Sequence, residues 1–147
     1  MKNTLLFALS LFLASGIFAQ TETKSVYATK VGAIKGYDPV AYFTQNKPVK
    51  GAADITFEWN GATWHFASAE NRDLFKGNPE KYVPQYGGWC AYGWAQGYPA
   101  KTEPEAWSIV DGKLYLNYSL DVRSDWDKKR AEYIQAADKN WANARKK

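Results

Sequence analysis

The clearest pattern in the sequence is the alternation of apolar and polar residues on either side of Asn60-Gly61. Residues 55–59 and 62–66 alternate with a period of two, and Asn-Gly is the favoured two-residue turn of a β-hairpin. In this register the large apolar side chains of the second strand face the core, and His65 lies on the opposite face.

A second hairpin and a long helix are predicted in the C-terminal part of the chain. Residues 106–118 contain apolar runs on both sides of Asp111-Gly112, which is another favoured two-residue turn. From about residue 121 to residue 144, apolar residues recur at helical spacing and mark one stripe. We therefore expect an α+β fold with a small antiparallel sheet from two hairpins, short helices, and a long C-terminal helix packed on the sheet.

The short helices are indicated by capping residues. Asp38 precedes Pro39, which fits the first helical position because no donor is lost there, so Asp38 is most simply an N-cap. Ser68 is expected to cap a helix that runs to about Lys76. Residues 86–97 are rich in glycine and aromatic residues, a composition that favours a short helix set between glycine loops.

Residues 1–19 resemble a cleavable export signal. Lys2 supplies a positive charge, an apolar run extends from Leu5 to Leu13, and small residues lead to a cleavage site after Ala19. The alternative is an uncleaved membrane anchor, but the apolar stretch is short of the ~20 residues that a spanning helix needs. We therefore expect a protein that is exported, periplasmic or secreted, with no transmembrane segment after cleavage.

The rest of the chain is expected to form one domain. Residues 20–30 are a polar, flexible lead-in, and residues 31–147 carry the domain. Its seven Trp, ten Tyr and seven Phe supply a large apolar area for a core. The formal charge of +4 is concentrated in the terminal Arg145-Lys146-Lys147, without the broad basic face of a nucleic-acid binder. A serine hydrolase and a P-loop enzyme are excluded by the missing motifs.

These segments resemble, in order and spacing, the YHS-domain family, and specifically its exported YHS domain-containing (seleno)proteins. The stretches that carry the resemblance are residues 36–43, 64–75, 78–82, 86–91 and 111–118. In metal-binding YHS modules, related to those attached to heavy-metal transport ATPases, cysteines stand at the positions of Ala41, Ala67 and Asn71. The thiolates that suit soft metals such as Cu(I) or Zn are therefore missing here. Some exported members place selenocysteine in the motif that holds Cys90, which implies a reactive or metal-binding group there.

Cys90 is the only cysteine, so it forms no disulfide within the chain. Three readings remain open: a buried cysteine that packs as a small hydrophobe, a reactive or ligand-binding thiol, and a disulfide between chains. The preceding Gly87-Gly88 permits a tight turn whose N–H groups point at the sulfur. A cysteine at a helix N-terminus has enhanced thiolate character.

His65, the only histidine, pairs with Cys90 in the reactive reading if its strand faces the glycine loop. The two residues then supply a base and a nucleophile, or two ligands for a transition-metal ion such as copper. Ordinary structural roles are the alternative for each. The candidate ligand-binding residues are Cys90, His65, Tyr37, Asp38, Trp89 and Tyr92.

Three functions follow from these candidates. The first is a non-catalytic exported YHS-like domain that binds a small ligand or metal ion near Cys90. The second is a thiol-redox protein that uses Cys90 with a partner thiol, since the chain has no resolving cysteine. The third is a structural or interaction domain with Cys90 buried.

Overall fold

The computed structural model describes residues 25–146. The predicted signal and residues 20–24 of the predicted lead-in lie outside the described residues. The fold is α+β, with antiparallel hairpins, short helices and a long C-terminal helix, which confirms the predicted class. Among residues 25–146, no helix combines the length and the apolar character that crossing a bilayer requires.

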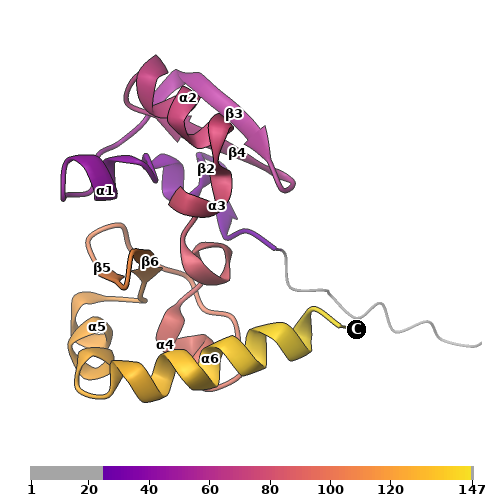
Figure 1. Cartoon of the computed structure of the whole chain (residues 1–147), viewed down its shortest axis with the longest axis vertical. Helices are drawn as coiled ribbons and strands as arrows, with labels where there is room; N and C mark the ends of the chain where they lie inside the picture. Colours follow the sequence, from indigo (N-terminus) through magenta and orange to yellow (C-terminus); the bar gives the residue numbers. More distant parts are fainter. Residues whose placement is uncertain (1–24, 147) are drawn as a thin grey trace, which may run out of the picture.

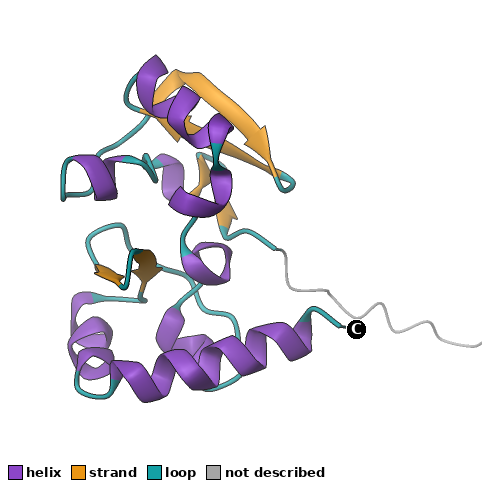
Figure 2. Ribbon diagram, in the orientation of Figure 1, coloured by secondary structure: helices purple, strands orange, loops and turns teal. Residues whose placement is uncertain are grey.

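The chain forms two lobes stacked along its long axis (Figure 1). The hairpin lobe, residues 25–83, contains β1 (Ala28–Thr29), β2 (Gly32–Ala33), η1 (Ile34–Gly36), α1 (Ala41–Thr44), β3 (Ala52–Trp59), β4 (Ala62–Phe66), α2 (Ala69–Gly77) and α3 (Pro79–Tyr82). The helical lobe, residues 84–146, contains η2 (Gln85–Gly88), α4 (Ala91–Ala95), β5 (Trp107–Val110), β6 (Lys113–Leu116), α5 (Leu120–Asp127) and α6 (Arg130–Ala144). Figure 2 shows the longest strands in the first lobe and the longest helix in the second.

The β3–β4 hairpin has the predicted turn and faces. Asn60 and Gly61 have φ of 50° and 76°, the left-handed pair that a type I′ turn requires. Trp64 and Phe66 of β4 are fully buried, whereas His65 between them is half-buried. Phe75 of α2 packs against both of these buried rings, at centroid distances of 5.2 and 5.3 Å. The hairpin and α2 thus enclose the core of the first lobe.

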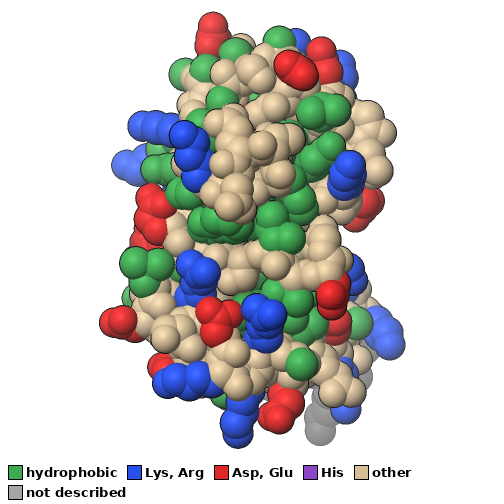
Figure 3. All heavy atoms as spheres, turned by 60° about the vertical axis from the view of Figure 1, so that its left-hand side comes forward, with side chains coloured by type: hydrophobic (Ala, Val, Ile, Leu, Met, Phe, Trp, Pro, Cys, Tyr) green, Lys and Arg blue, Asp and Glu red, His purple; other side chains and the backbone are tan. Residues whose placement is uncertain are grey.

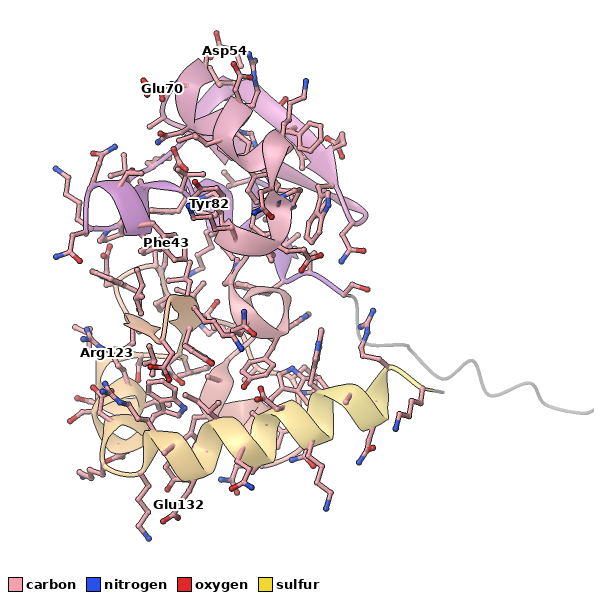
Figure 4. All side chains as sticks on the ribbon, in the orientation of Figure 1. Phe43, Asp54, Glu70, Tyr82, Arg123 and Glu132 are labelled. Carbon is pink, nitrogen blue, oxygen red and sulfur yellow. The ribbon has the colours of Figure 1, made fainter. Side chains whose placement is uncertain are left out.

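The short helices α1 and α3 close the same lobe on its other side. Phe43 of α1 and Tyr82 of α3, both labelled in Figure 4, meet edge to face with ring centroids 5.6 Å apart. Ser68 Oγ accepts a hydrogen bond from Asn71 N at 3.1 Å, which confirms the predicted cap of α2. Apolar side chains also gather across the waist between the two lobes on the face drawn in Figure 3.

The hairpins do not merge into one sheet. The structure has three separate two-stranded sheets, β1–β2, β3–β4 and β5–β6. The β5–β6 hairpin lies apart from the others, between the two lobes. Leu114 and Leu116 belong to the core of the hairpin lobe, and Tyr115 belongs to the core of the helical lobe. Side chains that alternate along one strand therefore supply two different cores.

The predicted C-terminal helix is divided into α5 and α6. Lys129 has φ of −141° and ψ of 35°, outside the helical region, and separates them. Trp126 of α5 packs on Tyr115 of β6 at a centroid distance of 5.4 Å. The longer α6 lies mainly across α4, where Trp141 meets Trp94 edge to face at 5.1 Å. The break lets one apolar stripe contact both a strand and a helix.

Candidate functional site

A pocket of about 290 Å³ opens beside Cys90 in the helical lobe. Its walls come from three places along the chain: the start of α4, the loop that follows α4, and the segment from the end of β6 into α5. No side chain in this lining carries a formal charge. The lining residues are Cys90, Tyr92, Gly93, Tyr98, Ala100, Tyr118 and Val122.

Cys90 lies at the N-terminus of α4 and its side chain caps that helix. Gly93 N donates to Cys90 Sγ at 3.4 Å, and the thiol in turn approaches Asn117 Oδ1 at 3.5 Å. Only 2% of the residue is exposed. Burial raises the pKa of the Cys90 thiol above its ordinary value, although nearby backbone N–H groups, that of Gly93 first among them, lower it in part. At neutral pH the group is therefore an uncharged thiol.

Asn117 holds Cys90 in place, although no motif in the sequence indicates this role. Its side chain is fully buried, and its Oδ1 accepts a hydrogen bond from Tyr92 N at 3.0 Å as well as the thiol contact. Its backbone is fixed by two further bonds, to Ala106 O at 2.9 Å and from Glu103 N at 3.1 Å. Within the part of the chain that the structure describes, Asn117 Nδ2 has no hydrogen-bond partner. An asparagine directly after a buried strand is the only local sign of this role.

The Gly87-Gly88 turn packs the N-terminal segment against the second lobe. Both glycines have positive φ, and Gly87 O accepts a hydrogen bond from Tyr27 N at 2.9 Å. Gly88 O accepts one from Thr102 Oγ1 at 2.7 Å. Gly93 N in the first turn of α4 donates to the Cys90 sulfur, so this donor comes from the helix and not from the glycine turn.

His65 lies in the other lobe. Its Nδ1 is 3.1 Å from Ala52 O across the β3–β4 hairpin, and its ring lies against Gly32, where an added Cβ would come within 2.7 Å of a ring carbon. It is not among the residues that line the pocket beside Cys90. Figure 1 shows β4, which contains His65, and α4, which directly follows Cys90, in different lobes. The structure therefore does not bring these two residues together.

The other predicted ligand residues are divided between the lobes in the same way. Tyr92 lines the pocket. Trp89 packs on Tyr27 at a centroid distance of 5.0 Å, and Tyr37 packs against the first core. The pocket residues that the sequence analysis did not identify are Gly93, Tyr98, Ala100, Tyr118 and Val122.

Asp38 is the centre of a hydrogen-bond network in the hairpin lobe. It is fully buried, and its Oδ1 accepts bonds from Val40 N at 2.8 Å and Ala41 N at 3.3 Å, so it caps the turn that leads into α1. Its Oδ2 accepts bonds from Ala67 N and Asn71 Nδ2, both at 2.8 Å. One carboxylate thus ties α1 to the end of β4 and to α2.

This network bears on metal binding, because Ala41, Ala67 and Asn71 are the positions at which the resemblance to metal-binding YHS modules implies cysteines. Here the three positions converge on the Asp38 carboxylate, which is satisfied by N–H donors, and none of the three carries a thiolate. Among residues 25–146, no group of three or more His, Cys, Asp and Glu side chains is placed to hold a metal ion. The residues present do not fit a soft metal ion at this place.

Comparison with known proteins gives one match. A model of the YHS domain family matches residues 40–86. No curated protein and no solved structure matches the chain. The matched segment contains the Asp38-bonded positions and ends before Cys90, so every residue that lines the pocket lies beyond it.

Proposed function

We propose that this chain, which contains a YHS domain at residues 40–86, is an exported small-ligand-binding protein whose ligand enters the pocket beside Cys90. The observation that carries the proposal is the pocket itself. It is concave, apolar and built from residues of separate segments, which is the usual form of a small-molecule site. Export is supported by the signal-like pattern of residues 1–19.

The surroundings of Cys90 support binding over thiol-redox chemistry. A redox cysteine needs access to its partner and a substantial thiolate fraction. Here the residue is 2% exposed and burial raises the pKa of its thiol. Metal binding is not supported either, because the pocket lining offers a single sulfur and no histidine or carboxylate. In this proposal the thiol is part of an apolar wall.

Ligand binding is tested by screening a panel of small organic probes against the isotope-labelled chain by NMR. Binding probes are expected to shift the amide resonances of Cys90, Gly93 and Val122. Val122→Trp fills the pocket and is expected to abolish those shifts. Val31→Trp is the matched control, because Val31 is exposed in the β1–β2 turn of the hairpin lobe and does not line the pocket. If no probe shifts the pocket resonances, or if Val122→Trp leaves binding intact, the proposal fails.

Thiol reactivity gives a separate prediction. Because the pKa of the Cys90 thiol is raised and its sulfur is buried, a disulfide reagent at pH 7 is expected to label the folded chain at least about tenfold more slowly than the urea-unfolded chain. The rate should rise with pH and level off at a higher pH than for an ordinary thiol. Equal rates for folded and unfolded chain would contradict the buried, neutral thiol and favour the redox function.

A further inference from the structure

We propose that the ligand of the pocket beside Cys90 is a neutral, flat molecule of one or two aromatic rings. This inference rests on the proposed function and specifies its ligand class. It follows from three properties of the pocket: the charge of its lining, its volume, and the aromatic side chains at its exposed edge.

The lining excludes ions. Three tyrosines, a glycine, an alanine, a valine and the thiol of Cys90 surround the space, and none of them carries a charge at neutral pH. A carboxylate or an ammonium group in this space would lose its hydration without gaining a counter-charge, which is costly. Lys101, which follows the lining residue Ala100, is outside the lining, with its Nζ 5.2 Å from the ring centroid of Tyr118 and 3.7 Å from the carboxylate of Glu103.

The volume limits the size of the ligand. An apolar cavity of roughly 150 Å³ is large enough for benzene. The pocket beside Cys90 measures about 290 Å³, nearly twice that, which accommodates two fused rings. A longer molecule would extend past the rim into water.

The edge of the pocket favours aromatic rings over saturated ones. Tyr98 and Tyr118 line the pocket and are yet 51% and 45% exposed, an unusual position for two large side chains. Aromatic rings pair favourably in offset or edge-to-face arrangements, beyond the area that they bury. A thiol sulfur is also soft and polarizable, so Cys90 suits the edge of an aromatic ring. A ligand ring that enters here would cover both tyrosines.

The inference is tested with three probes of similar size: indole, indole-3-carboxylate and cycloheptanol. We expect indole to shift the resonances of Cys90 and Gly93, and the charged and the saturated probes to bind at least about tenfold more weakly. Tyr98→Leu and Tyr118→Leu keep the edge apolar but remove one ring, and each is expected to weaken indole binding about three- to tenfold. Phe57→Leu removes a half-buried ring from the hairpin lobe and is expected to leave the affinity unchanged.

The outcomes separate the ligand class from the function. If cycloheptanol or indole-3-carboxylate binds at the pocket resonances as tightly as indole and is blocked by Val122→Trp, the aromatic, neutral class is wrong and the binding function stands. If neither Tyr98→Leu nor Tyr118→Leu weakens indole binding, the proposed aromatic class is wrong as well. If none of the three probes, and none of the wider panel, reaches the pocket, both proposals fail.

Discussion

Replacement of Asp38 by alanine is expected to lower the free energy of unfolding by about 3–5 kcal/mol. The Asp38 carboxylate is fully buried and accepts four hydrogen bonds, from Val40 N, Ala41 N, Ala67 N and Asn71 Nδ2. Alanine leaves these donors without a partner, and each buried donor left unpaired costs about 1 kcal/mol or more. The loss is a large part of the roughly 5–15 kcal/mol that holds a domain of this size together.

Urea unfolding followed by tryptophan fluorescence measures the effect. Asp54→Ala is the control, since Asp54 lies on β3 and is exposed, and it should change stability by less than about 0.5 kcal/mol. Asp38→Asn keeps one acceptor oxygen and should fall between the alanine variant and the wild type. A loss of under about 1 kcal/mol for Asp38→Ala would show that the network does not hold the hairpin lobe together.

Replacement of Gly87 by alanine is expected to release the N-terminal segment from the Gly87-Gly88 turn. Gly87 has φ of +63°, and a Cβ built there would lie 1.7 Å from Ser25 O, so the backbone has to move. The bond from Tyr27 N to Gly87 O and the burial of Val26 would be lost with it. We expect a destabilisation of about 2–4 kcal/mol and faster tryptic cleavage after Lys30.

Gly61→Ala is the matched control for this substitution. Gly61 has a similar φ of +76°, but a Cβ there meets nothing within 4 Å. It therefore incurs only the left-handed backbone strain, about 1–2 kcal/mol. If the two alanine variants are equally stable and equally resistant to trypsin, the contact between the N-terminal segment and the turn does not contribute to stability.

The sequence predicted those parts of the fold that depend on neighbouring residues. The Asn60-Gly61 and Asp111-Gly112 turns have the expected positive φ values, and Ser68 caps α2. These signals are local, because turn type and capping are decided within four residues. Asp38 was predicted as the N-cap of a helix with Pro39 at its first position, but α1 begins at Ala41 and Asp38 Oδ1 caps the turn before it. The contacts of its other oxygen depend on α2, which is distant in the sequence.

The candidate site was predicted only in part, for the same physical reason. Cys90 and Tyr92 lie within the glycine- and aromatic-rich segment 86–97, and both line the pocket. Tyr98, Tyr118 and Val122 reach the pocket from other segments and carry no motif of their own. The faces of β4 were assigned correctly, but alternation fixes only the side on which His65 lies. It says nothing about the distance between that side and Cys90.

The position of β6 makes the interior of each lobe depend on the same strand. Leu114 and Leu116 complete the core that surrounds the matched YHS segment, and Tyr115, between them, belongs to the core that surrounds α4 to α6. A gene fragment that encodes residues 40–86 alone would keep the family signature and lose part of its own interior. The strand is therefore part of both cores, so removing β6 from the matched YHS segment would expose apolar surface in both lobes.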